Sequence, residues 1–536
     1  MRKDRTEGQG GKRMSRKILG CILSGCIAVG ATACGGTAEE GENDSLKVPD
    51  GYTLTEPGER IGTNAYGVGV EFDPHFLSQN VAKGVSEEGD WQIVADRVEK
   101  MGIDRFRVMI LPSWIEPMND NDDPSSVDTT SLTTENAEMR SLYKVLDLAQ
   151  ANGIDVNLTL WGVENKVSLI DNGMNAAVKA QGGHFLNRGN SGNNWVLGTL
   201  YPEEFAENLS IYLQHLFGMG YTCIKEVTPI NEPNWSYIVN NEVEFENYKT
   251  LCYAVHDRLT ADGLRDKVKL NLSDNTDTAR SWLESTMEEL DGIADIYNSH
   301  TYIFGYGSTN DEIRAWEEEN INVIRYTQKP HMIGEFGSDQ TTGSSRQSDI
   351  DLYERGVLMV RQMLNFYNAG AAGASYWVLC DEYYNFTDSY EAMMMLGLWK
   401  GRKETYVFDE EYYRTIGEDY EVRPQYYAIS LMSKHVPKGG ETYPVFLKND
   451  YAVGTAFKGE DGKWTYVFAN GNEGGDPLKI ALRNGNAYGD FDRFVYEKDS
   501  LPSDDSLIPS SGTLRTKGQV LSFELVPGTV LVLKQK

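Results

Sequence analysis

The chain has 536 residues, of which 40% are hydrophobic and 11% aromatic, and this composition excludes wholesale disorder and predicts two folded domains. Its formal net charge of −30 argues against nucleic acid or an anionic membrane surface as a partner, because both would repel the protein.

The first 33 residues have the pattern of a signal peptide. Basic residues Arg13, Arg16 and Lys17 precede an apolar run over residues 18–29, which is too short to span a membrane. Small residues then precede Cys34, an arrangement that resembles the lipobox of bacterial lipoproteins. This resemblance implies that Cys34 becomes the lipidated first residue of an extracytoplasmic protein anchored to the membrane at the surface of a bacterium. A plain secretory signal is the alternative.

A polar, acidic segment with several glycines follows over residues 34–62. Such a composition is typical of a flexible tether. Further along the chain, Cys223, Cys252 and Cys380 are odd in number and lie in apolar segments. We expect these three residues to be buried thiols, and not disulfides or metal ligands.

Short apolar runs alternate with amphipathic helical patterns over residues 63–436. Eight strands are predicted, over residues 67–72, 106–111, 156–160, 223–228, 268–272, 296–299, 331–333 and 372–377, with a closing helix over 424–435. Eight strand–helix units predict an α/β fold, the (β/α)8 barrel. A doubly wound open sheet is the alternative, but no glycine-rich phosphate loop supports it.

The pattern changes to strands and tight turns after residue 436. Trp464, Tyr466 and Phe468 alternate along one run, and an Asp461–Gly462 turn precedes them. Further strand-like runs continue to the C-terminus. Residues 437–536 are therefore predicted to form an antiparallel β-sandwich domain.

Two glutamates stand at the ends of predicted strands. Glu232 follows the fourth strand in the run Asn-Glu-Pro, and Glu335 ends the seventh. Loops at the carboxyl ends of barrel strands build the active sites of this fold, and a carboxylate is costly to bury there unless it has a function. Hydrolysis of a glycosidic bond with retention needs one protonated and one ionised carboxyl group. Glu232 and Glu335 are therefore candidate catalytic residues.

These residues resemble those of the clan A glycoside hydrolases, which include families five, thirty and thirty-nine. The resemblance covers residues 66–436, and families thirty and thirty-nine also carry an appended β-sandwich. It implies that Glu232 is the acid/base and Glu335 the nucleophile of a retaining mechanism that uses no metal or other cofactor.

The resemblance also implies partners for the nucleophile. Arg107 ends the second strand, as does the arginine that keeps the nucleophile ionised in this clan. His300 and Tyr302 end the sixth strand in a His-x-Tyr arrangement, in which the tyrosine of family five donates to the nucleophile. We therefore expect Arg107 and Tyr302 to keep Glu335 ionised.

Residues that contact the sugar are implied in the same way. Asn231 would hydrogen-bond a sugar hydroxyl, and Trp377 ends the eighth strand, where the clan places an aromatic platform. Trp161 follows the third strand, where family five usually has a histidine, and this departure weakens an assignment to family five. Trp114 and Trp235 are, with Trp161 and Trp377, candidate platforms for an oligosaccharide.

Each residue also has a purely structural interpretation. Glu335 could be a buried carboxylate paired with Arg107, His300 could be a hydrogen-bonded core histidine, and Trp377 could belong to barrel packing. Their joint placement at the ends of the expected strands favours catalysis. We expect a monomeric retaining glycoside hydrolase that cleaves a β-linked polysaccharide or oligosaccharide. The alternatives are an exo-acting glycosidase such as an arabinofuranosidase, and a non-catalytic glycan-binding surface lipoprotein.

Overall fold

The computed structural model describes residues 47–74, 88–116, 123–160, 202–234, 245–276, 279–340, 347–387, 390–406, 410–483, 489–517 and 519–536, and the structural statements that follow concern these residues. The chain from Ser45 to Lys536 forms one compact unit. Among the described helices, none combines the length and the apolar character needed to cross a membrane.

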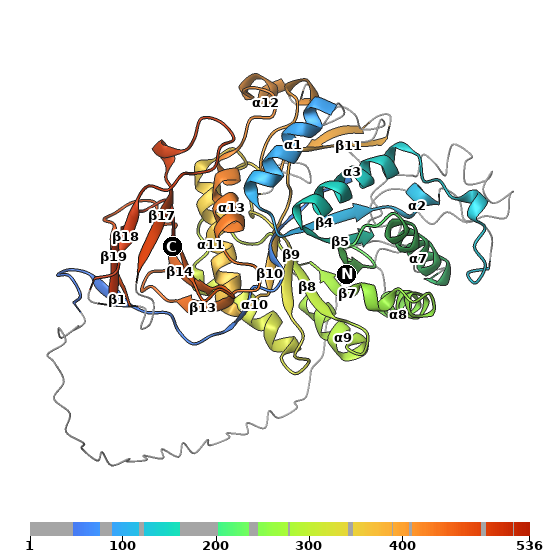
Figure 1. Cartoon of the computed structure of the whole chain (residues 1–536), viewed down its shortest axis with the longest axis horizontal. Coiled ribbons are helices and arrows are strands. Elements are labelled where there is room, and N and C mark those ends of the chain that lie inside the picture. The colour runs from blue at the N-terminus through green and yellow to red at the C-terminus, as the bar shows by residue number, and fades with distance from the viewer. Residues whose placement is uncertain are drawn as a thin grey trace, which may run out of the picture. The chain divides into compact units, whose positions relative to one another are not determined.

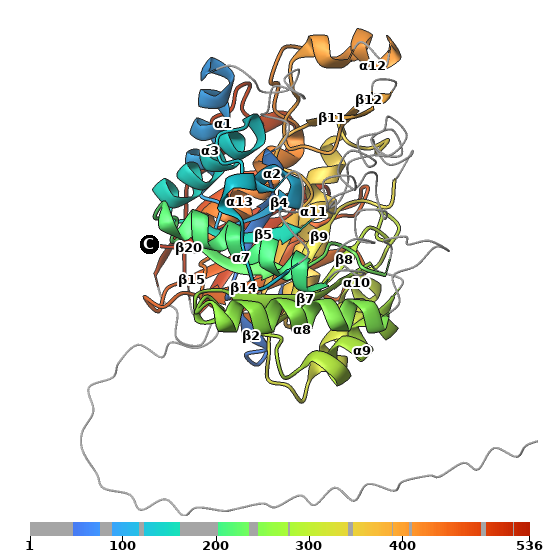
Figure 2. The same cartoon turned by 90° about the vertical axis from the view of Figure 1, so that its right-hand side faces the viewer.

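Eight parallel strands close into a barrel, and the expected (β/α)8 fold is confirmed (Figures 1 and 2). Neighbouring strands follow chain order, and the last strand closes the ring by pairing with the first. The strands are β3 (Gly67–Glu71), β4 (Arg105–Ile110), β5 (Asp155–Leu160), β6 (Ile224–Thr228), β7 (Lys269–Asn275), β8 (Ile296–Thr301), β9 (His331–Phe336) and β10 (Gly373–Tyr376).

Helices follow the strands and surround the barrel (Figure 1). Local sequence sets several of their ends: the side chain of Asn136 caps one helix and Gly153 ends it with a left-handed backbone, while Pro424 opens the closing helix. The helices are α1 (Glu88–Met101), α2 (Pro112–Ile115), α3 (Ala137–Asn152), α7 (Pro202–Gly218), α8 (Phe245–Ala261), α9 (Arg280–Leu290), α10 (Asn310–Ile324), α11 (Tyr353–Ala369), α12 (Glu410–Thr415) and α13 (Pro424–His435). A hairpin of β11 (Glu382–Thr387) and β12 (Tyr390–Met394) follows β10.

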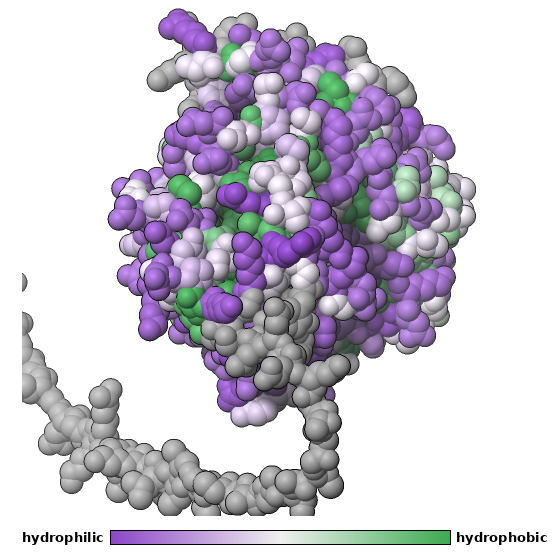
Figure 3. Space-filling model, turned by 60° about the vertical axis from the view of Figure 1, so that its left-hand side comes forward, coloured by the Kyte–Doolittle hydropathy of each residue, from purple (hydrophilic) through white to green (hydrophobic). Residues whose placement is uncertain are grey.

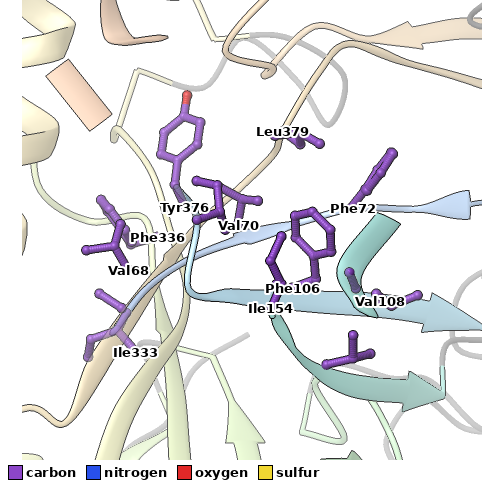
Figure 4. Close-up of a cluster of buried hydrophobic side chains, with 14 of the residues drawn as sticks. Val68, Val70, Phe72, Phe106, Val108, Ile154, Ile333, Phe336, Tyr376 and Leu379 are labelled. Carbon is purple, nitrogen blue, oxygen red and sulfur yellow. The ribbon is translucent and has the colours of Figure 1, made fainter. Parts of the chain in front are cut away.

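The hydrophobic core lies between the barrel and its helices. Side chains alternate along each strand, so Val68 and Val70 of β3 join this core with Phe106 and Val108 of β4 (Figure 4). The residues that alternate with these along β4, Arg105 and Arg107, point to the opposite side of the strand and fill the inside of the barrel. Burial of the apolar set provides the main driving force for folding.

The inside of the barrel is charged where many barrels are apolar. In a lower layer Arg105 donates to both oxygens of Glu226, at 3.3 and 2.8 Å, and to Ser375 Oγ at 3.0 Å. Asn271 donates to the same carboxylate at 3.0 Å. Buried charges lower stability unless they are paired and hydrogen-bonded. These bonds therefore offset the desolvation cost of the charged barrel interior. A second charged layer above it forms the candidate site.

Two sheets whose C-terminal strands are antiparallel form the predicted β-sandwich around a separate apolar core. Most of its strands come from the C-terminal segment, as expected. They are β13 (Glu441–Val445), β14 (Ala452–Lys458), β15 (Trp464–Asn470), β16 (Leu478–Arg483), β17 (Asp490–Tyr496), β18 (Thr513–Arg515), β19 (Val520–Leu525) and β20 (Thr529–Gln535). The face of the molecule in Figure 3 is mainly hydrophilic, with apolar residues in small groups among polar ones.

The expected tether over residues 34–62 needs correction in its second half. β1 (Thr53–Thr55) pairs in parallel with β16, and β2 (Gly62–Thr63) pairs with β13. Backbone hydrogen bonds to the sandwich therefore hold this segment, although its composition is that of a flexible linker. Both ends of the described chain contribute strands to the sandwich.

Helix α11 joins the barrel to the sandwich through buried contacts. The rings of Tyr353 and Tyr496 stack at 4.5 Å with an interplanar angle of 6°. The Tyr496 hydroxyl donates to the Tyr353 backbone oxygen at 2.7 Å, and the Tyr353 hydroxyl donates to the Gly528 backbone oxygen at 2.6 Å. Asn368 on the same helix donates to the Gly454 backbone oxygen at 3.0 Å. These hydrogen bonds hold the sandwich against helix α11 on one side of the barrel. The candidate site lies elsewhere, at the carboxyl ends of the barrel strands.

Candidate active site

Charged side chains from several strands meet at the carboxyl ends of the barrel strands. Arg107 of β4 is the centre of this cluster, and it is fully buried. Its Nη1 donates to Glu335 Oε1 at 2.6 Å and to Glu71 Oε2 at 2.9 Å. Its Nη2 donates to Asn231 Oδ1 at 2.6 Å and to Asp274 Oδ2 at 2.8 Å. One guanidinium group therefore orients four acceptors from four strand ends.

Glu335 ends β9 and faces into the barrel because the strand is irregular there. The pairing of β8 with β9 shifts register between Ser299 and His300, so Gly334 is the extra residue and Glu335 comes opposite His300. A Cβ atom at Gly334 would lie 2.1 Å from the Asn298 amide oxygen, so a larger residue does not fit. Bulges of this kind redirect side chains next to functional sites. The Tyr302 hydroxyl donates to Glu335 Oε2 at 2.9 Å.

Glu232 lies four residues beyond the end of β6 and differs from Glu335 in exposure. Its side chain is 20% exposed, compared with 4% for that of Glu335. Its backbone has a left-handed φ of 43°, a conformation that strains a non-glycine residue and is concentrated at functional sites. One oxygen of Glu232 lies within 4.8 Å of an oxygen of Glu335. The two carboxylates thus share one small space, with Glu232 nearer to solvent.

His300 connects Glu232 to the interior. Its Nδ1 lies 2.8 Å from Glu232 Oε1, and its Nε2 lies 3.1 Å from Asp274 Oδ1. A carboxyl oxygen therefore faces each ring nitrogen, an arrangement that favours the protonated imidazolium ring. Burial lowers the pKa of His300, but the charges of Glu335 and Asp274 and the hydrogen bonds outweigh burial and raise it to about 10.

The pKa of Glu335 differs from the expectation that Arg107 and Tyr302 keep it low. Burial is the largest influence and raises this pKa to about 7, against the lowering effect of the His300 and Arg107 cations and together with the charge of Glu232. In the described part of the chain, the four carboxyl groups of Glu71, Glu232, Asp274 and Glu335 gather around two cations, Arg107 and His300. The two cations therefore do not neutralise four ionised carboxylates.

The same three side chains could in principle hold a metal ion, because one ligand atom each from Glu232, His300 and Glu335 lie within 4.8 Å of one another. The histidine argues against this use. A carboxyl oxygen beside each nitrogen favours the protonated ring, and a protonated ring has no lone pair to give to a metal. The arrangement fits acid–base chemistry better than metal binding.

Two of the predicted tryptophan platforms lie in the described residues, and their surroundings differ. Trp377 is 5% exposed and belongs to a small apolar cluster against which Tyr302 packs, which places it near the site; its peptide bond to Val378 is cis. Trp114, in α2, is 3% exposed and packs in the main core between barrel and helices. We therefore interpret Trp114 as a core residue. Trp161, Trp235 and Cys34 lie outside the described residues.

Two further residues belong to the cluster and were not identified from the sequence. Glu71 ends β3, and Asp274 lies near the end of β7 in the run Ser-Asp-Asn. Burial raises the pKa of Glu71 well above its ordinary value, whereas the charges of Arg107 and His300 outweigh burial at Asp274 and lower its pKa to about 2. A carboxylate at the end of a barrel strand was the signal that could have indicated both.

Comparison with solved structures shows the same architecture in several glycoside hydrolases. A glycoside hydrolase family 30 subfamily 8 xylanase from Clostridium acetobutylicum superposes with a TM-score of 0.56 at 14% identity, over 90% of this chain and 99% of its own. An endo-beta1,6-glucanase gives 0.57 at 14% identity, over 91% and 94%. An alpha-L-arabinofuranosidase from Thermotoga maritima gives 0.57 at 12% identity, over 90% and 98%.

At these identities the similarity establishes the fold, a (β/α)8 barrel with a β-sandwich. No protein-family model matches the sequence, and the search of curated proteins gave no match.

Proposed function

We propose that this protein is a retaining glycoside hydrolase of β-linked glycans, with Glu335 as nucleophile and Glu232 as acid/base. The observation that supports this best is the distance between the two carboxylates, whose nearest oxygens are no more than 4.8 Å apart. Retaining enzymes place their carboxyl groups ~5–5.5 Å apart, whereas inverting enzymes leave ~6.5–9.5 Å for a water molecule. The glycosidases with the same fold agree with this proposal.

The division of labour follows from the surroundings of each carboxylate. Glu335 is deep in the barrel, where Arg107 and Tyr302 fix both of its oxygens, so it can attack an anomeric carbon from a defined direction. Glu232 is nearer to solvent, where a leaving group departs and water later arrives. Once Glu335 is bonded to the sugar its charge is gone, and Glu232 can then act as base toward water.

Asn231 and Trp377 are proposed to contact the sugar. Arg107 donates to Oδ1 of Asn231, so the amide NH2 points away from the guanidinium, and we propose that it donates to a sugar hydroxyl when substrate binds. Trp377 belongs to the apolar cluster against which Tyr302 packs, and we propose that it borders the sugar whose anomeric carbon Glu335 attacks.

The proposal is tested by incubating the purified protein with a panel of β-linked glucans, xylans and aryl glycosides and following the products by NMR. We expect release of a reducing sugar whose anomeric configuration is first that of the substrate. A first product of inverted configuration would contradict the retaining mechanism. Binding without hydrolysis across the panel would support the non-catalytic glycan-binding alternative.

An exo-acting arabinofuranosidase is the second candidate, and the similarity to the Thermotoga maritima enzyme favours it. The two carboxylates would act in the same way on an arabinofuranoside. Product size distinguishes the candidates, because an exo-acting enzyme releases single sugars from the start and an endo-acting enzyme releases oligosaccharides.

The pH dependence should reflect the buried nucleophile. Attack needs ionised Glu335, and burial raises the pKa of this residue to about 7. The kcat/KM value should therefore fall as the pH drops below about 7, because a growing share of Glu335 is protonated in the free enzyme. In Tyr302→Phe the ionised Glu335 loses a hydrogen-bond donor, so its pKa should rise further. The pH below which kcat/KM falls should then be higher than in the native protein. A fall in kcat/KM with an apparent pKa near ~4.3, the ordinary value of glutamate, would contradict the assignment of Glu335 as a buried nucleophile.

We also propose that Cys34 is lipidated and anchors the enzyme to the membrane outside the cytoplasm. The support is the basic, apolar and small-residue pattern that precedes it. Cys34→Ser should move the protein from the membrane fraction to the soluble fraction while its kcat stays the same, because the described site includes no residue of this segment. A Cys34→Ser protein that still sediments with membranes would rule out this anchor.

A further inference from the structure

Asp274 occupies a singular position between the two proposed catalytic carboxylates. Its Oδ2 accepts from Arg107 Nη2 at 2.8 Å, and Arg107 in turn binds Glu335. Its Oδ1 lies 3.1 Å from His300 Nε2, and His300 in turn binds Glu232. Asp274 itself is fully buried. One carboxylate therefore joins the cation that holds the nucleophile to the cation that holds the acid/base.

The backbone of β7 is distorted to place this side chain. The pairing with β8 shifts register between Ser273 and Asn275, so Asp274 is the extra residue of a bulge. Ser273 and Asp274 both have left-handed backbones, with φ of 77° and 48°. This conformation costs a non-glycine residue free energy, and it persists where surrounding contacts over-determine it. Three contacts hold the strained backbone of Asp274 in place: those with Arg107 and His300, and a hydrogen bond donated by the Asn298 amide.

We propose that Asp274 is a positioning residue that keeps His300 protonated, so that His300 donates Nδ1–H to Glu232 while Arg107 is held on Glu335. This inference rests on the proposed function in naming the two carboxylates as catalytic. Asp274 touches neither the sugar nor the reacting atoms. It acts through the two cations, and it links the orientation of the nucleophile to that of the acid/base.

The charges around His300 show why this one carboxylate matters. The groups that face the ring are Glu232 after β6, Asp274 of β7 and Glu335 of β9, which lies 3.5 Å from Nδ1. Arg107 of β4 is the neighbouring cation, and Tyr302 is bonded to Glu335. Glu232 and Glu335 change charge during a retaining reaction, because one gives up its proton and the other becomes a covalent ester. Asp274 keeps its charge throughout, so it is the constant partner of the imidazolium.

The test measures the protonation of His300 directly. Histidine labelled with 13C in the ring is incorporated, and the NMR signal of His300 is identified by its loss in His300→Gln. In the native protein His300 should remain protonated up to about pH 9, since its pKa is raised to about 10. In Asp274→Asn the pKa should fall by roughly 1–3 units, the range over which a close opposite charge shifts a titratable group.

Asp349→Asn is the matched control. Asp349 is also a buried aspartate that links an arginine, Arg355 at 2.8 Å, to a second side chain, Tyr306 at 2.8 Å. Among the described residues, neither His300 nor Arg107 hydrogen-bonds to it. It should leave the His300 titration unchanged. Asp274→Asn should also lower kcat by roughly 10–100-fold, a loss typical when the partner behind a functional side chain is removed, with KM nearly unchanged.

The outcomes separate this inference from the proposed function. A native His300 that titrates below pH 7, or a pKa that does not move in Asp274→Asn, overturns the role of Asp274 even if the protein hydrolyses glycans. If Asp274→Asn does not fold, the titration of the native protein decides. A His300 that behaves as expected in a protein with no hydrolytic activity supports the role of Asp274 in setting the charge of His300 and contradicts the glycosidase proposal alone.

Discussion

Glu335→Ala is expected to reduce glycoside turnover by at least roughly 10⁴-fold, as loss of a covalent nucleophile can do, while the protein stays folded. The fold should survive because Arg107 keeps three other acceptors, on Glu71, Asn231 and Asp274. The substitution also removes one of the carboxylates that crowd two cations. Circular dichroism and thermal unfolding provide the check on folding, and initial rates on an aryl glycoside give the turnover.

Added azide distinguishes a lost nucleophile from general damage to the site. With the Glu335 carboxylate gone, azide should occupy its space, attack the anomeric carbon once and give a glycosyl azide of inverted configuration. Glu226→Gln is the matched control, because Glu226 is equally buried in the barrel and bonded to Arg105 in the layer below. It should lower stability but not kcat. An active Glu335→Ala protein would remove this residue from the mechanism.

The barrel and much of its site could be predicted from the sequence because the signals there are local. Strand ends are marked by apolar runs, and the carboxyl ends of barrel strands meet at one face. Glu232 and Glu335 stand at predicted strand ends, the family resemblance adds Arg107, His300 and Tyr302, and the structure brings these residues into direct contact. The closing helix over 424–435 begins at a proline and has the predicted bounds.

The orientation of residues in irregular backbone could not be predicted, even where a carboxylate at a strand end marks the residue as a candidate. Asp274 points into the barrel because it is the extra residue of a bulge with positive φ, and period-two alternation contains no information about such a position. Trp114 follows a barrel strand, as a platform residue would, but the one-turn helix α2 places it in the core. Strand order does not reveal that change of direction.

The first two strands of the sandwich were missed for a different reason. β1 and β2 are three and two residues long, and the segment that contains them is polar and acidic. Their stability comes from pairing with strands more than 370 residues further along the chain, such as Thr53 with Ile480 and Thr63 with Glu441. Non-local pairing of this kind leaves no periodic pattern in so short a segment, so composition suggested a tether.

Glu232→Ala is expected to affect substrates according to their leaving group. The leaving group of a natural glycoside would depart as an alkoxide without the proton of Glu232. Hydrolysis of such a substrate should therefore fall by roughly 10²–10⁴-fold. An aryl glycoside with an acidic phenol needs little protonation, so Glu335 should still form the glycosyl-enzyme at a rate close to that of the native protein. Water then reacts slowly without a base, so the intermediate accumulates and rapid mixing should show a burst of phenol.

The structure also predicts what azide does in this variant. Glu232 is the more exposed carboxylate, and its removal opens space on the side from which water attacks the glycosyl-enzyme. Azide should enter there and give a glycosyl azide with the configuration of the substrate, opposite to the product of Glu335→Ala. His300 keeps its contact with Asp274, so the fold should be retained. The same azide configuration from both variants would contradict the assignment of two distinct roles, because one carboxylate on each side of the sugar must give opposite products.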